Sequence, residues 1–200
     1  MVVVGSGVMA ENLANGNLAV ALLANSVATG AGLFLLIQGG QWLGTARFNP
    51  VMSLLSWLDC EFQMVQLGIF VLVQVGGAIL GVFLVHLMFG LPIIEASSHD
   101  RSDFRFLFSE FIATFGLVFV AKTCPRQRVA ASVALYIVAA YWFTASTAFA
   151  NPALTLARAC TATFAGLTWA SVPGFFVAQW IGGWAAWRLC RSLTPLLDEV

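Results

Sequence analysis

Two copies of one short pattern occur in this 200-residue chain: Asn49-Pro50-Val51-Met52-Ser53-Leu54 and Asn151-Pro152-Ala153-Leu154-Thr155-Leu156. Asparagine is a favoured N-cap residue, and proline is preorganised for the first position of a helix, where its missing N–H has no partner to lose. Each copy therefore predicts a helix that begins at the Asn-Pro pair. We call Asn49, Pro50 and Val51 the first box, and Asn151, Pro152 and Ala153 the second box.

The two predicted helices are too short to cross a membrane. The apolar segments that begin at the boxes cover about 49–58 and 151–160, and charged residues limit them: Asp59 and Glu61 in the first case, Arg158 in the second. Ten helical residues reach about 15 Å, which is half of a bilayer core of about 30 Å. Half-helices at membrane depth are tolerated only where protein buries them or water lines them, so the pattern predicts a pore or a binding site.

The composition predicts a membrane protein. Hydrophobic residues make up 60% of the chain and charged residues only 9%, against roughly 25% charged in soluble domains. A spanning helix needs about 20 apolar residues. We predict an all-α integral membrane protein with full spans at about 17–38, 63–89, 106–122, 128–147 and 172–192. A sixth span at 1–14 is expected to be incomplete, with a truncated start, because its apolar run from Val2 to Ala10 has half the required length.

The order of these segments predicts an inverted repeat within one domain, 1–200. Three full spans, an odd number, separate the two half-helices, so the second must enter from the opposite face of the membrane. The first repeat would cover about 1–90 and the second about 106–193.

The basic residues predict an orientation. One side of the membrane carries a short basic loop and a basic segment after the last span: Lys122, Arg126, Arg128, Arg188 and Arg191. On the other side, two arginines are offset by two acids: Arg101, Arg105, Asp100 and Asp103. The positive-inside rule then places both termini in the cytoplasm, in a multi-pass protein of the cell (inner) membrane.

Several classes of function find no support in the sequence. The formal net charge is zero without a basic run, which argues against nucleic-acid binding. The four cysteines are isolated from one another and from histidines at ligand spacing, so we expect neither a metal site nor a cofactor. The chain also lacks a recognisable catalytic triad or phosphate loop, and we predict that it is not an enzyme.

Paired Asn-Pro-Ala boxes on two half-helices resemble the aquaporin and glycerol-channel (major intrinsic protein) superfamily, with Val51 as a variant in the first box. Residues 44–50 are similar to the family's Ser-Gly-Ala-His-Phe-Asn-Pro, and residues 109–115 to the opening of its fourth helix. The resemblance extends over essentially the whole chain. It implies a passive channel for small neutral solutes, embedded in lipid as a homotetramer.

The resemblance also implies roles for particular residues. The half-helices would meet end to end, with Asn49 and Asn151 presenting amide donors to solutes while the positive helix ends repel cations. Glu110 would support the backbone of a re-entrant loop; alternatively, it is a surface residue at a helix end. Arg47, where the family has histidine, either lines a vestibule or pairs with Asp59 or Glu61.

By spacing from the boxes, the family's selectivity constriction corresponds to Thr29, Ala139, Ala148 and Leu154. Leu154 stands where water- and glycerol-conducting members carry arginine, so the constriction should be wider and more apolar. Arg158 lies one turn later and does not match that position.

The segment 140–147 resembles bacterial channels associated with arsenic-resistance gene clusters. This likeness implies water, glycerol-like polyols and metalloid hydroxides such as arsenous acid as solutes. Two alternatives are a truncated, non-conducting homologue and a coupled transporter, for which Glu110 is the one candidate titratable group inside the membrane.

Overall fold

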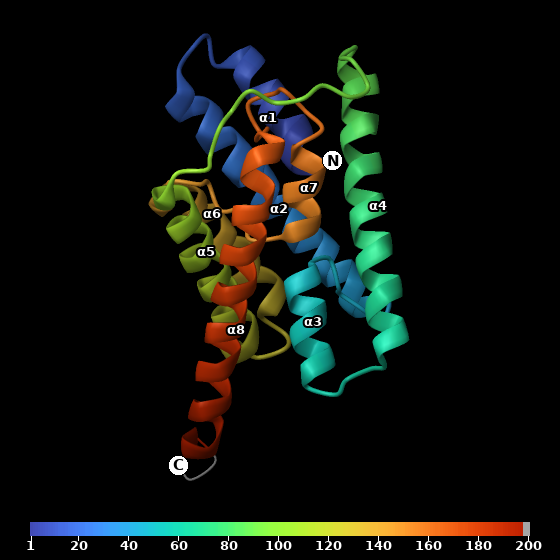
Figure 1. Cartoon of the computed structure of the whole chain (residues 1–200), viewed down its shortest axis with the longest axis vertical. Coiled ribbons are helices and arrows are strands. Elements are labelled where there is room, and N and C mark those ends of the chain that lie inside the picture. The colour runs from blue at the N-terminus through green and yellow to red at the C-terminus, as the bar shows by residue number, and fades with distance from the viewer. Residues whose placement is uncertain (198–200) are drawn as a thin grey trace.

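A computed structural model describes the backbone of residues 1–197 and the side chains of residues 1–193. The described chain is helical and contains no strand. Its elements are shown in Figure 1 and follow the order α1 (Val2–Leu13), α2 (Leu18–Trp42), α3 (Pro50–Leu58), α4 (Met64–Phe89), α5 (Phe104–Thr123), α6 (Val129–Phe143), α7 (Pro152–Arg158), the 3-10 turn η1 (Trp169–Ser171) and α8 (Val172–Leu197).

Three helices of the described part are long and apolar enough to cross a membrane: α2, α4 and α5, with 25, 26 and 20 residues. Helix α8 has 26 residues, whereas α6 has 15 and α1 has 12. Helix α1 covers most of the segment 1–14, for which a partial span was predicted. The all-α membrane fold is confirmed.

Four predicted helix ends were wrong. Helix α2 continues to Trp42 instead of residue 38, and α8 continues to Leu197 instead of residue 192. The span at 128–147 ends at Phe143, because Thr144 adopts an extended backbone with φ −110° and ψ 139°, which a helix cannot continue. The second half-helix ends at Arg158 rather than at residue 160.

The half-helices α3 and α7 lie between the longer helices and approach each other from opposite ends of the bundle. In Figure 1, α3 occupies the lower half and α7 the upper half, and their N-terminal ends meet near the middle. Both pack against α4 and α8. The order α1–α4, in which the third element is a half-helix, recurs in α5–α8, and this arrangement is the predicted inverted repeat.

Close helix contacts depend on glycine at one pair of positions in α8. A Cβ added to Gly182 would lie 2.3 Å from the carbonyl oxygen of Phe111 in α5, and one added to Gly183 would lie 2.3 Å from a side-chain atom of Val51. Glycine therefore lets α8 approach both α5 and the first box, as small residues do in membrane helices generally.

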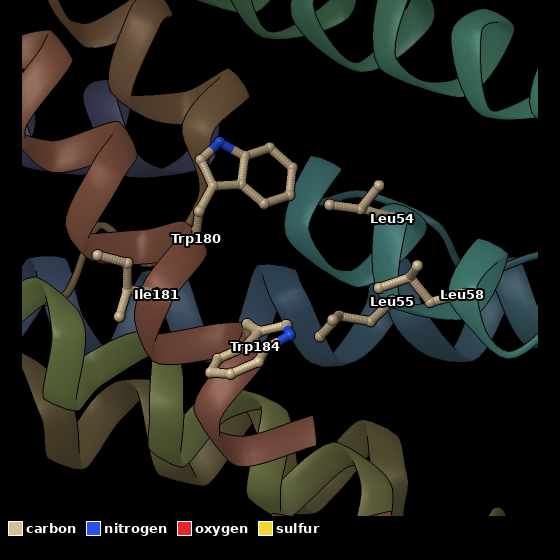
Figure 2. A pocket seen from close by; sticks show the side chains of 6 residues that line it. All are labelled: Leu54, Leu55, Leu58, Trp180, Ile181 and Trp184. Atoms are coloured by element: carbon tan, nitrogen blue, oxygen red, sulfur yellow. The ribbon is translucent and has the colours of Figure 1, made fainter. Parts of the chain in front are cut away.

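An apolar groove of about 320 Å³ runs along the outer side of α3 and α8. Figure 2 shows its lining: Leu54, Leu55, Leu58, Trp180, Ile181 and Trp184. This lining is almost entirely apolar, in contrast to the polar groups at the meeting point of the two half-helices.

Candidate functional site: the paired boxes and their supports

Each box asparagine caps its own half-helix. The Asn49 Oδ1 accepts a hydrogen bond from the N–H of Val51 at 3.0 Å. The Asn151 Oδ1 accepts from the N–H groups of Ala153 at 3.0 Å and Leu154 at 3.3 Å. Both asparagines have extended backbone and are followed by proline at the first helical position. The local chemistry of the Asn-Pro pair thus produces both helix starts.

The same two asparagines bind the two boxes to each other. The Asn49 Nδ2 donates to the carbonyl oxygen of Ala150 at 2.7 Å, and the Asn151 Nδ2 donates to the carbonyl oxygen of Phe48 at 2.9 Å. A primary amide has two N–H groups. Among the described residues each Nδ2 has this single protein acceptor, so the second N–H of each side chain remains available to another acceptor.

Glu110 lies fully buried in α5 and accepts hydrogen bonds from the loop before the second box. Its Oε1 accepts from the N–H of Phe149 at 2.9 Å, and its Oε2 from the N–H of Ala150 at 2.8 Å. The Nε2 of Gln179 donates to the same Oε2 at 2.6 Å and to the Thr155 hydroxyl at 2.9 Å. Three donors stabilise the buried carboxylate. Both oxygens of Glu110 are therefore engaged in holding this loop, and the coupled-transporter alternative is not favoured.

The loop that Glu110 holds, residues 144–150, has an irregular backbone. Thr147, Ala148 and Ala150 all have positive φ angles, which cost about 1–3 kcal/mol each for residues other than glycine. Such a conformation persists only where its surroundings fix it. Two more contacts do so: the N–H of Ala145 donates to the Ser109 hydroxyl at 3.1 Å, and the carbonyl of Ser146 accepts from Arg101, as described next.

Arg101 belongs to the loop between α4 and α5, outside the spanning helices. Its Nη1 donates to the Ser146 carbonyl at 3.0 Å, and its backbone N–H donates to the Ser171 hydroxyl at 2.9 Å. Burial lowers the pKa of Arg101 from its usual value. Beside it, hydrogen bonds from Ser102 lower the pKa of Asp100. This loop therefore connects the second-box loop to the 3-10 turn η1 at one end of the bundle.

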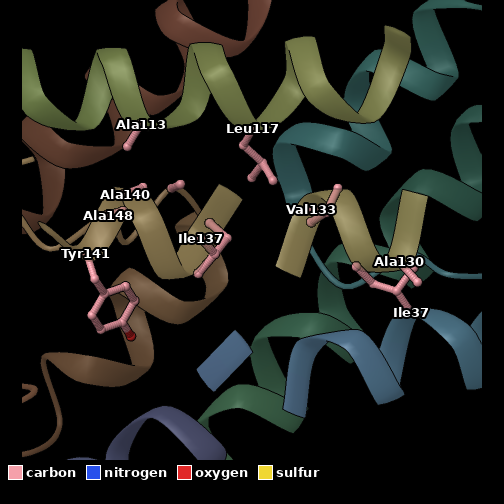
Figure 3. Close-up of a cluster of buried hydrophobic side chains, with 10 residues drawn as sticks. Ile37, Ala113, Leu117, Ala130, Val133, Ile137, Ala140, Tyr141 and Ala148 are labelled. Carbon is pink, nitrogen blue, oxygen red and sulfur yellow. The ribbon is translucent and has the colours of Figure 1, made fainter. Parts of the chain in front are cut away.

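The structure brings some of the residues assigned to the constriction together. The Thr29 hydroxyl lies 3.3 Å from that of Tyr141, and Tyr141 and Ala148 belong to one buried cluster (Figure 3). Ala139 is exposed and precedes Tyr141 by two helical positions, about 200° around α6. It therefore lies on the side of α6 opposite Thr29. Sequence spacing missed Tyr141, although a tyrosine in an apolar span signals a hydroxyl in need of a partner.

Leu154 is partly exposed in the first turn of α7. Arg158, in the last turn of the same half-helix, is 2% exposed. Its Nε donates to the carbonyl of Ala165, and its Cζ lies 3.3 Å from the centroid of the Phe149 ring. This burial could not be predicted from the sequence, because Ala165 and Phe149 contact Arg158 only in the folded chain.

At the other end of the bundle, ion pairs fix the turn after α3. Arg47 pairs with Glu61 at 2.7 Å, which is one of the alternatives left open by the sequence, and its Cζ lies 4.4 Å from the Phe62 ring centroid. Asp59 pairs with Lys122 of α5 at 2.5 Å and accepts from the Trp187 indole of α8 at 2.8 Å. The end of the first half-helix is thus anchored to α5 and α8.

Gln74 of α4 holds the loop before the first box. Its Nε2 donates to the carbonyl of Arg47 at 3.0 Å and to the Ser53 hydroxyl at 2.8 Å. Gln179 occupies the corresponding place in the second repeat, where it contacts Thr155. Among the described residues, no group of three or more His, Cys, Asp or Glu side chains could hold a metal ion.

Two half-helices that enter a helical membrane bundle from opposite ends and meet at their asparagine caps define an inverted-repeat channel. The sequence profile of the Major intrinsic protein family matches residues 1–137. The chain is also 44% identical, over 194 residues, to Aquaglyceroporin AqpS of Rhizobium meliloti (strain 1021), covering 96% of this chain and 83% of the relative. The chain belongs to the Major intrinsic protein family and is a passive membrane channel for small neutral solutes. Channels of this family are transporters rather than enzymes.

Proposed function

We propose that the channel conducts water, glycerol-sized polyols and metalloid hydroxides such as arsenous acid between the two boxes. The observation that carries this proposal is the reciprocal pair of hydrogen bonds from Asn49 to Ala150 and from Asn151 to Phe48. These bonds hold both side-chain amides at the same level, and each amide keeps one N–H for a passing solute. A hydroxyl oxygen can then exchange water for an amide donor at this level.

The residues assigned to the constriction support a solute larger than water. Leu154 and Ala148 contribute no charge, and Leu154 stands at the first turn of α7, where a guanidinium would narrow the passage. The hydroxyls of Thr29 and Tyr141 add one polar side to these apolar groups. We include Tyr141 in the proposed constriction in place of Ala139. Glycerol and arsenous acid are both uncharged, and each carries three hydroxyl groups for such a surface. The relative named above, an aquaglyceroporin, supports the same class of solute.

Stopped-flow light scattering on proteoliposomes tests this proposal. Vesicles with the purified chain should shrink and reswell faster than empty vesicles when challenged with glycerol, and arsenous acid should enter faster than into empty vesicles. Vesicles with the Asn49→Asp/Asn151→Asp double variant provide the matched control. Glycerol and arsenous acid permeabilities equal to those of empty vesicles, from a folded and inserted chain, would contradict the proposal.

The chain is proposed to form a homotetramer in the inner membrane. Each chain is a single domain of two repeats, with both termini in the cytoplasm. The basic residues of the loop after α5 support this orientation. Lys122, Asp59 and Trp187 meet at one end of the bundle, and the exposed Cys60 lies beside Asp59. In a variant retaining Cys60 as its one cysteine, a membrane-impermeant maleimide should label Cys60 only after the inner membrane is opened. Cross-linking in the membrane tests the tetramer.

A further inference from the structure

Among the side chains that the structure describes, two arginines in the half of the bundle that contains α7 have no carboxylate in contact. Arg158 lies in the last turn of α7, and Arg101 lies in the loop before α5. The ion pairs among the described residues join others: Arg47 with Glu61, Arg105 with Asp103, and Lys122 with Asp59. The charges of Arg101 and Arg158 are therefore not neutralised by direct pairing.

Phe149 is the shared neighbour of these two guanidinium groups. The Arg158 Cζ lies 3.3 Å from the ring centroid and the Arg101 Cζ lies 5.4 Å from it. An aromatic face stabilises a cation without removing its charge. Arg158 is fixed further by its Nε bond to Ala165, and Arg101 by its bond to Ser146. Both positive charges are thus held in fixed positions.

These contacts leave one atom unexplained. The Nη1 of Arg158 is buried and has no hydrogen-bond partner. A buried donor without an acceptor is rare in native proteins, and an ionisable side chain inside a membrane protein marks a solute pathway more often than a packing site. The Nε bond and the ring contact alone would suffice for a purely structural arginine.

Arg158 lies beside the proposed constriction. It follows Leu154 by four positions in α7, so the two side chains share one face of the half-helix. Phe149, whose ring Arg158 contacts, directly follows Ala148, which belongs to the same buried cluster as Tyr141. Glu110 interacts with both arginines through space, but its single negative charge faces two positive charges, and its oxygens already accept three hydrogen bonds. A net positive charge remains at this level.

We propose that Arg158 is a specificity-determining residue of this channel and that Arg101 reinforces it. The uncompensated charge rejects cations one turn beyond Leu154. Leu154 then widens the passage without removing the electrostatic barrier to cations, because the Arg158 guanidinium supplies the positive charge from the next turn of α7. This inference rests on the proposed channel function.

The test measures glycerol and methylammonium permeability in the same proteoliposomes. Wild-type vesicles should conduct glycerol and exclude methylammonium. Removing a fixed charge in Arg158→Gln should raise methylammonium permeability about tenfold or more, the size expected for a unit charge a few ångströms from the ion path. Arg101→Gln should give a smaller rise, and Arg158→Lys should keep the exclusion. Arg105→Gln, which removes an exposed arginine from the same end of the bundle, should change neither permeability.

A second variant separates charge from packing. In Arg158→Gln/Leu154→Arg the guanidinium is moved one turn toward the box, and methylammonium exclusion should return. Unchanged exclusion in folded Arg158→Gln, with wild-type glycerol flux intact, would overturn this inference and leave the channel function standing. A wild-type chain without glycerol flux would instead contradict the channel function itself. If neither Arg158→Gln nor Arg158→Lys folds and Arg101→Gln leaves exclusion unchanged, Arg158 is structural and the inference fails.

Discussion

The loops that lead into the two boxes present the same Asn-Pro start in different ways. Residues 144–150 contain three non-glycine residues with positive φ, whereas residues 43–48 contain one positive φ, at Gly44. The N–H groups of Phe149 and Ala150 bind Glu110. In the described structure, the corresponding N–H groups of Arg47 and Phe48 make no hydrogen bond. The backbone N–H groups of the second loop donate to a carboxylate, whereas the first loop is bound mainly through its backbone carbonyl groups.

This difference shows that the same Asn-Pro helix start can be held in place by two different sets of hydrogen bonds. The first loop gains its order from Gln74, which binds the Arg47 carbonyl, and from Asn151, which binds the Phe48 carbonyl. The second gains its order from α5 and α8 through Glu110 and Gln179. We therefore expect the channel to tolerate changes around the first loop better than changes around the second.

The largest effect should come from Glu110→Ala. It leaves the N–H groups of Phe149 and Ala150 buried without an acceptor, and each lost hydrogen bond to a charged group is worth about 1.5–3 kcal/mol. Strained residues in the loop would then relax, and we expect loss of most folded protein and of glycerol flux. Membrane yield, monodispersity in detergent and flux are the measurements. Glu11→Ala, at an exposed site in α1, is the control. If both variants gave the same yield and flux, the second loop would not depend on Glu110 as we expect.

Asn151→Asp should abolish glycerol flux or reduce it at least about tenfold, since a carboxylate replaces a donor that faces the Phe48 carbonyl. Asn49→Asp makes the same change opposite Ala150. Because the second loop contains the strained residues, loss of the bond to Ala150 in Asn49→Asp should lower the thermal unfolding temperature more than loss of the bond to Phe48 in Asn151→Asp. Asn15→Asp in the exposed α1–α2 turn controls for charge alone. Normal swelling rates in an inserted Asn151→Asp channel would show that the amide donor is not needed.

Leu154→Arg should act on selectivity rather than on folding. A guanidinium in the first turn of α7 narrows the proposed constriction, so the ratio of glycerol to water permeability should fall several-fold while water flux persists. The matched change in the first repeat, Met52→Arg, lies at the corresponding position after the first box and provides the comparison. A ratio that stays constant in Leu154→Arg would place the constriction elsewhere.

Glu61→Gln should have the smallest effect. It breaks the ion pair with Arg47, but the Glu61 side chain is 43% exposed, and exposed pairs contribute about 0–1 kcal/mol. Arg47 also keeps its contact with the Phe62 ring. We expect flux within a factor of about two of wild type, for the same reason. A loss comparable to that of Glu110→Ala would mean that the first loop has an acidic support of its own.

Much of the architecture could be predicted because it rests on local chemistry. Asparagine followed by proline caps a helix wherever it occurs, and the odd number of spans between the copies fixes their opposite entry. The end of α6 could not be predicted, since the apolar sequence continues to residue 147 while Glu110, far away in the chain, holds the backbone in another path. The same irregular loop lies between α6 and the second box, so counting residues back from the box does not locate the side chain that faces Thr29. The count assigned Ala139, whereas Tyr141 contacts Thr29.

The reciprocal bonds between the boxes have a consequence for biogenesis. Asn49 donates to a carbonyl 101 positions later in the chain, and Asn151 to one 103 positions earlier. Each half of the protein thus supplies the carbonyl acceptor for the box asparagine of the other half. While the ribosome is still synthesising the second repeat, the first half-helix cannot reach its final hydrogen-bonding state. These two hydrogen bonds can form only after residue 150 has been synthesised, so the pairing of the boxes is a late step that joins both halves.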